Sequence, residues 1–168
     1  MPGPGPALPP HSPSGGSTVT ANRVAATADR FRAAVEKREL AALEELFTPD
    51  IRFYSPVKFR PFEGREMVLG LFGVLLRTFE DFRYVGAFDG TSQTSADGAE
   101  TPSAVLLFRA TVDGKEIHGI DLLHVDEDGR IKEFTVMVRP QSAVEHLGKA
   151  VYAGLVADGL VPPLPEGQ

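Results

Sequence analysis

The chain has 168 residues, of which 42% are hydrophobic and 24% charged, and its formal net charge is −6. This is the composition of a globular protein of one domain, long enough to bury a single core. The absence of cysteine excludes disulfides, thiolate metal sites and thiol nucleophiles. No run of Lys or Arg gives the electrostatic footprint of a nucleic-acid binder, and the longest apolar run, residues 67–76, is about half of the ~20 residues that cross a membrane.

Both ends of the chain are rich in proline. We therefore predict a disordered Pro/Gly-rich tail over residues 1–19, a folded domain over residues 20–159 and a flexible tail over residues 160–168. The segment before Arg23 has neither the basic region nor the apolar run of a secretory signal. We therefore expect a cytoplasmic protein.

Several segments have the apolar spacing of helices. The first is an amphipathic helix with the buried stripe Val24, Ala28, Phe31 and Val35. A short helix is predicted at residues 40–47, ending before Pro49, and residues 65–79 predict a helix that is apolar on more than one face. In the last helix, after the strands, Ser142 and Glu145 have the spacing of a capping box.

The segments between the third and last helices predict a sheet. These segments are four strands, at residues 81–88, 103–112, 115–125 and 130–139. A further short strand is predicted before the third helix, beginning at Ile51. Asp113-Gly114 predicts a tight hairpin, and the sequence DEDG at 126–129 predicts a four-residue turn.

The two turns also predict which residues lie opposite each other. Leu106 is expected opposite Asp121 across the first turn, and Phe134 opposite Asp121 across the second. One face then collects apolar residues around this single carboxylate: Leu106, Phe108, Ala110, Ile117, Gly119, Leu123, Phe134, Val136 and Val138. The reverse face is of mixed polarity, which suits a subunit interface or a solvated face.

Asp121 is the main candidate functional residue, because an ionised side chain is costly to bury. Two interpretations remain open. Apolar walls would keep the acid protonated, so that it donates to a ligand carbonyl or acts as a general acid. Alternatively, the carboxyl group is satisfied by backbone amides, a nearby tyrosine or a trapped water. Tyr54 and Ser55 lie at the end of a strand, where one of the two would point inward toward Asp121 or a ligand.

The histidines do not form a metal site. His118 and His124 lie on the reverse face, six residues and roughly 20 Å apart along one strand, too far to share an ion. We interpret them as packed interface histidines. No segment has the spacing of a phosphate-binding loop, and we expect neither a metal nor a cofactor.

The order of these elements resembles that of the nuclear transport factor 2-like (NTF2-like) superfamily, which includes ketosteroid isomerases and SnoaL-type cyclases. The resemblance covers roughly residues 20–150 and is most specific in residues 31–64, in GIDLLHVDEDGRI and in EFTVMV. It implies an α+β, cystatin-like fold: a cone-shaped, curved and mostly antiparallel sheet wrapped around N-terminal helices, followed by a C-terminal helix. It also implies an apolar cavity and a homodimer formed through the outer sheet face.

The resemblance assigns positions to several residues. Asp121 corresponds to the oxyanion-hole aspartic acid of the ketosteroid isomerases, and the pocket wall corresponds to Phe134, Val136 and Val138. Phe31 stands where those enzymes have the tyrosine that donates to the oxyanion, and Ser55 where they have the general-base aspartate. A serine hydroxyl without an adjacent base does not take up a carbon-bound proton near neutral pH. Steroid isomerisation by that mechanism is therefore not expected.

The sequence thus predicts a domain that binds a small apolar or carbonyl-containing molecule around one buried Asp, without a complete catalytic set and without nucleic-acid or membrane partners. The alternative is an isomerase, dehydratase or aldol-type cyclase that acts on a polyketide-like, terpenoid or steroid-like carbonyl compound with Asp121 as the acid. The candidate catalytic residues are Asp121 and Tyr54. The candidate ligand-binding residues are Phe31, Ser55, Leu106, Phe108, Gly119, Phe134, Val136 and Val138.

Overall fold

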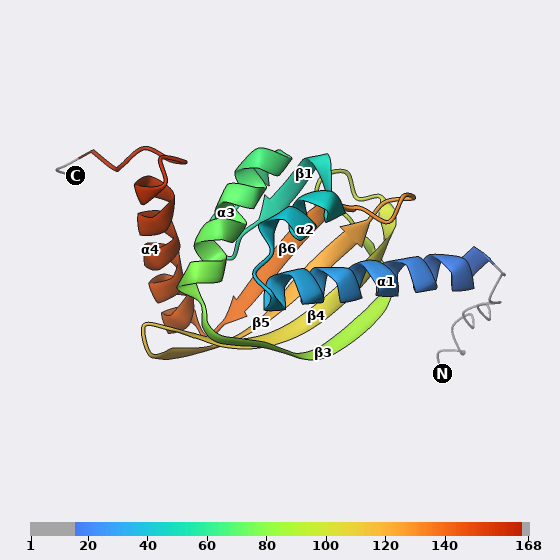
Figure 1. The fold of residues 1–168 in the computed structure, drawn as a ribbon, viewed down its shortest axis with the longest axis horizontal. Helices are drawn as coiled ribbons and strands as arrows, with labels where there is room; N and C mark the ends of the chain where they lie inside the picture. The colour runs from blue at the N-terminus through green and yellow to red at the C-terminus, as the bar shows by residue number, and fades with distance from the viewer. Residues whose placement is uncertain (1–15, 166–168) are drawn as a thin grey trace, which may run out of the picture.

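A six-stranded sheet and four helices make up the described part of the chain, residues 16–165, in this computed structural model (Figure 1). In chain order the elements are α1 (Gly16–Glu36), α2 (Leu40–Leu46), β1 (Phe47–Tyr54), β2 (Phe62–Glu63), α3 (Arg65–Thr78), β3 (Glu80–Gln93), β4 (Glu100–Val112), β5 (Lys115–Val125), β6 (Ile131–Arg139) and α4 (Gln141–Ala157). The strand order is β2-β1-β6-β5-β4-β3, with only β1 and β6 parallel. The predicted α+β architecture is confirmed, and the sheet is open.

The helices pack on the concave side of the sheet. Figure 1 shows α1 crossing in front of the strands while β3 and β4 curve beneath it, with α3 and α4 side by side at the other end. The predicted stripe of α1 is buried. Its Phe31 ring lies 5.9 Å from that of Phe72 in α3 and 5.2 Å from that of Phe134 in β6, between ring centroids. Within the described residues, no helix is both long and apolar enough to span a membrane.

The boundaries of the folded part differ from the prediction at both ends. α1 begins at Gly16, inside the predicted N-terminal tail, while residues 1–15 and 166–168 lie outside the described part. At the other end Leu160 packs on α3, because a Cβ built on Gly70 would lie 2.8 Å from Leu160 Cδ1. The segment predicted as a flexible tail therefore begins with an anchored residue.

Two local predictions about helix ends were wrong. α2 ends at Leu46, and Phe47 already begins β1, in which Pro49 is accommodated. The predicted capping box is absent: α4 begins at Gln141 with Pro140 as its N-cap, and no side chain caps the helix. Glu145 instead accepts a hydrogen bond from Gln141 Nε2 at 3.4 Å.

The register was predicted correctly across the first hairpin and incorrectly across the second. Leu106 lies opposite Asp121, as expected. In the second hairpin Asp121 lies opposite Val136, not Phe134. One residue of this shift arises at the turn, where Val125 pairs with Ile131 in place of Arg130, and a β-bulge between His124 and Val125 adds the second. A shift of two keeps each side chain on the same face of the strand. The inward set around Asp121 is therefore confirmed.

Gly119 is the one inward position of this set without a side chain. A Cβ built on it would overlap the ring of Phe108, its partner on β4. The glycine therefore allows the Phe108 ring to lie flat against the backbone of β5, beside Asp121.

The turn between β3 and β4 is tied to the outer face of the sheet. The buried carboxylate of Glu133 accepts hydrogen bonds from the backbone N–H groups of Ser95 and Ala96, at 2.6 and 3.3 Å. His124 is fully buried beneath the same turn, with Nε2 3.1 Å from the carbonyl oxygen of Gln93. The prediction that His124 is a subunit-interface residue was therefore wrong, since its own chain covers it.

Candidate ligand-binding cavity

A cavity of about 240 Å³ lies between the sheet and helices α3 and α4. The loop after β1 closes one side of it. Its walls are almost entirely apolar and include Leu71, Leu75, Leu76, Phe108, Phe134, Val136, Leu147 and Val151. A concave, mainly apolar space with few polar groups is the usual form of a small-molecule site.

Asp121 lines this cavity and is only 5% exposed. Tyr84 of β3 donates a hydrogen bond from its hydroxyl to Asp121 Oδ2 at 3.0 Å, and Tyr84 lines the cavity as well. No other hydrogen bond of the Asp121 side chain is found within the part of the chain described. A tyrosine therefore partners the carboxyl group, as one of the two interpretations expected, and the pair borders an open space.

Burial determines the protonation of this pair. Desolvation raises the pKa of Asp121 from 3.8 to about 7, although the hydrogen bond from Tyr84 works in the opposite direction. Burial, and then the charge of Asp121, raise the pKa of Tyr84 well above its usual value of 10. Near neutral pH the phenol is protonated and the acid is present in both forms. Because Tyr84 donates to Oδ2, Oδ1 is the oxygen available to carry the proton of the neutral acid.

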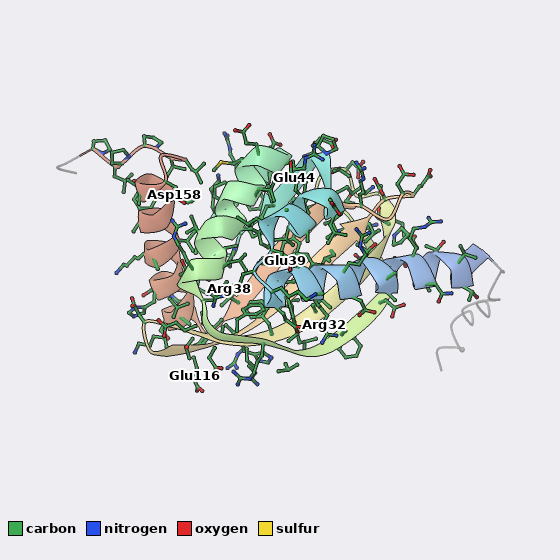
Figure 2. All side chains as sticks on the ribbon, in the orientation of Figure 1. Arg32, Arg38, Glu39, Glu44, Glu116 and Asp158 are labelled. Carbon is green, nitrogen blue, oxygen red and sulfur yellow. The ribbon has the colours of Figure 1, made fainter. Side chains whose placement is uncertain are left out.

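Tyr84 is held from two sides. The guanidinium carbon of Arg32, on the side of α1 that faces β3 (Figure 2), lies 5.7 Å from the centroid of the Tyr84 ring, and the Phe82 ring packs edge-on at 5.0 Å. Sequence analysis missed Tyr84. Its strand was predicted, but no turn signal gave the register between β3 and β4, and that pairing contains a bulge between Tyr84 and Gly86. The available signal was that Phe82 and Tyr84 are two residues apart on one strand, which places both rings on the same face of the sheet.

The structure brings four of the eight predicted ligand-binding residues to the cavity: Ser55, Phe108, Phe134 and Val136. Phe31 and Leu106 are fully buried in the core and do not line it. Gly119 and Val138 border a separate groove near the end of β6. The predicted pocket was therefore placed on the correct face but extended too far along the strands.

Tyr54, a candidate catalytic residue, does not line the cavity beside Asp121. It lies opposite Thr135 on β6, whose neighbours Phe134 and Val136 face the cavity, so Tyr54 faces the outer side and lines a groove there. Ser55 is the inward residue. Its Oγ accepts hydrogen bonds from the backbone N–H groups of Val57 and Lys58, at 3.4 and 3.1 Å, and so fixes the loop at the cavity mouth.

Comparison with known proteins identifies the family. A model of the SnoaL-like domain matches residues 28–134. The chain belongs to the SnoaL-like domain family. A search of curated proteins found no match.

Solved structures with the same architecture agree with this assignment. A steroid delta-isomerase from Pseudomonas aeruginosa is 36% identical, with a TM-score of 0.70, over 83% of this chain and 96% of the other. A protein with a cystatin-like fold from Silicibacter pomeroyi DSS-3 is 27% identical, with a TM-score of 0.70, over 80% and 88%. A putative ketosteroid isomerase from Kribbella flavida, 19% identical with a TM-score of 0.52 over 71% and 80%, shares the fold. The resemblance to the NTF2-like superfamily is thereby confirmed.

The chemistry open to this SnoaL-like domain is limited by what lines its cavity. Asp121 and Lys58 are the only Asp, Glu, His, Lys or Arg side chains among the lining residues that the structure describes. Asp121 itself is therefore the one carboxyl group positioned to move a proton, and no histidine or second carboxylate lies beside it as a partner. Nor do the described residues contain a cluster of three or more His, Asp or Glu side chains suited to a metal ion. Among the lining residues that the structure describes, the site therefore has one carboxyl group in a mainly apolar wall.

Proposed function

We propose that this SnoaL-like domain binds a small, mainly apolar molecule that places an acceptor oxygen, such as a ketone carbonyl, beside Asp121. The observation that carries the proposal is a buried carboxyl group, hydrogen-bonded to Tyr84, on the wall of an otherwise apolar cavity. The neutral acid donates to the ligand oxygen, while Tyr84 keeps the carboxyl group oriented. Convergence of a few polar groups in an apolar pocket is what fixes ligand orientation in small-molecule sites.

The same geometry predicts selectivity for ligands that carry an acceptor oxygen. A ligand without an acceptor oxygen leaves the buried donor of Asp121 unpaired, at a cost of about 1–3 kcal/mol. A ketone satisfies the donor and buries its hydrocarbon body against the surrounding leucine and phenylalanine side chains. We therefore expect the domain to distinguish a ketone from a hydrocarbon of the same shape by roughly tenfold in affinity.

Calorimetric titration with 2-acetylnaphthalene and 2-ethylnaphthalene tests this proposal. At pH 6 the ketone is expected to bind about tenfold more tightly than the hydrocarbon, and the preference should be lost at pH 9, where Asp121 is ionised. Asp121→Asn should retain the preference at both pH values, because its amide donates regardless of pH. Equal binding of the two probes at pH 6, or an unchanged preference in Asp121→Leu, would show that Asp121 does not recognise the ligand.

The alternative function is catalytic, as an isomerase, dehydratase or aldol-type cyclase. Its support is the 36% identity to the steroid delta-isomerase over most of both chains. Asp121 would supply the acid, and the base would have to come from the substrate or from Asp121 itself. Conversion of a β,γ-unsaturated ketone to its conjugated isomer, followed by ultraviolet absorbance, measures this activity. Turnover that Asp121→Asn abolishes would favour the enzyme over the binding protein.

We also propose that the domain is a homodimer through its outer sheet face. Phe88 and Met137 are 67% and 55% exposed there, and the partly exposed Ile120 and Leu122 lie on the same face. Sedimentation of the protein should give a dimer, and Met137→Glu should shift it toward monomer. A monomeric parent protein at micromolar concentration would refute the proposal.

A further inference from the structure

Lys58 is the second charged residue that borders the cavity. It follows β1 in the loop that forms the mouth, and it is exposed, whereas Asp121 is buried. Within the described residues no carboxylate lies within ion-pair distance of Lys58. The mouth of the cavity therefore carries an uncompensated positive charge, in a protein whose net charge is −6.

Several contacts hold Lys58 at this position. Its backbone N–H donates to Ser55 Oγ at 3.1 Å, and its Nζ lies 3.9 Å from the centroid of the Phe62 ring, which also lines the cavity. The neighbouring Val57 packs on α4, since a Cβ built on Gly148 would lie 3.0 Å from Val57 Cγ1. The ammonium group is thus placed over an apolar ring at the rim, and part of the entropy of fixing a lysine is already lost before a ligand arrives.

The strand register gives the separation between the two charged residues. Tyr54 lies opposite Thr135, so the next residue, Ser55, is level with Val136, which in turn lies opposite Asp121. Two strand spacings of ~4.8 Å separate the backbones of Ser55 and Asp121 by about 10 Å. Lys58 lies three residues beyond Ser55. The acid and the ammonium group therefore border the same apolar space from different elements, the acid from the buried strand β5 and the ammonium group from the exposed loop after β1.

We propose that the ligand is an oxo acid: an elongated apolar molecule with a carbonyl oxygen at Asp121 and a carboxylate, or a similar anionic group, at Lys58. This inference rests on the proposed function and adds the chemical class of the ligand to it. The carbonyl enters first and the charged end stays at the rim, where the anion remains partly hydrated while it pairs with Lys58. An apolar cavity with one positive group at its mouth favours that orientation over the reverse.

The test is a titration of the full-length protein with 9-oxodecanoic acid and with its methyl ester at pH 6 and low salt. The parent protein is expected to bind the acid about fivefold more tightly than the ester, and the difference should shrink in 0.5 M salt. Lys58→Met should abolish the preference for the acid over the ester, and Lys58→Arg should retain it. Arg60→Met is the matched control, because Arg60 is an exposed cation of the same loop that does not line the cavity.

The outcomes separate this inference from the proposed function. Equal binding of the acid and the ester, or a preference for the acid that survives in Lys58→Met, would overturn the assignment of Lys58 and leave the ketone site intact. Binding of 2-acetylnaphthalene without binding of either oxo compound would likewise overturn the oxo-acid class. If none of the three probes binds, the proposed function itself is wrong.

Discussion

Asp121 shows how burial raises the pKa of a carboxyl group, so that its neutral form is present near neutral pH. In water the carboxyl group would be ionised at pH 7, but apolar walls disfavour the charge and raise its pKa to about 7. Tyr84 provides the single hydrogen bond that keeps the group oriented. A carboxyl group with a raised pKa makes the stability of the fold depend on pH, and this effect is measurable without a ligand.

Asp121→Asn is predicted to flatten the dependence of stability on pH. Because the pKa of Asp121 is about 7 in the folded protein and 3.8 ordinarily, the folded state holds the proton more tightly between these values. The free energy of unfolding should therefore fall as pH rises from about 4 to about 7, by on the order of 4 kcal/mol, and then level off. Urea unfolding of the parent and of Asp121→Asn from pH 4 to pH 8 measures this. Parallel curves for the two proteins would contradict the raised pKa.

At the scale of elements, hairpins were predictable where a turn determines them. Asp113-Gly114 is a two-residue turn with one regular pairing, and the predicted pair of Leu106 with Asp121 is found. The DEDG turn is longer and is followed by a bulge that the sequence does not encode locally, so the predicted pair of Asp121 with Phe134 was wrong by two residues. The period of two along a strand preserved the inward face in spite of this error. Tyr84 could not be placed, because its register depends on a long turn and a second bulge.

Gly119→Ala is predicted to destabilise the packing of β4 on β5. The new methyl group would overlap the Phe108 ring, which is itself buried in the core. Moving that ring is expected to cost about 1–3 kcal/mol, the usual range for overpacking a core. Gly90→Ala on β3 is the control, since nothing lies within 4 Å of a Cβ built there. Comparable midpoints for the two variants in urea unfolding would show that the contact with Phe108 is unimportant.

The two hydrogen bonds that Glu133 accepts from Ser95 and Ala96 are predicted to hold the β3–β4 turn to the outer face of the sheet. In Glu133→Ala the N–H groups of Ser95 and Ala96 lose their acceptor, and their hydrogen exchange should accelerate by tenfold or more, in line with the loss of a charge-assisted hydrogen bond. Glu116→Ala is the control, because Glu116 is an exposed residue near the first hairpin turn (Figure 2). Unchanged exchange of the two amides in Glu133→Ala would mean that other contacts hold the turn.

At the scale of the whole molecule, the proposed function depends on incomplete filling of the space between sheet and helices. The sequence predicted the curved sheet and the helices that cover it, but whether the inward phenylalanine rings leave a cavity or fill it depends on how each ring is placed, which the sequence pattern does not give. Phe31 illustrates the difference: it was expected to line the pocket, and it packs instead with Phe72 and Phe134 in the solid part of the core. Lys58 likewise became a site residue only once the loop after β1 was seen at the mouth.

The most direct test of the account is the titration of the Asp121 carboxyl carbon by ¹³C NMR, with and without 2-acetylnaphthalene, using Asp121→Asn to assign the signal. We predict a midpoint near pH 7 in the free protein, since burial raises the pKa to about 7. The midpoint should rise further when the ketone is bound, because only the neutral acid donates to it. A midpoint near 4, unmoved by the ketone, would contradict the claim that Asp121 is a neutral donor in an apolar binding cavity.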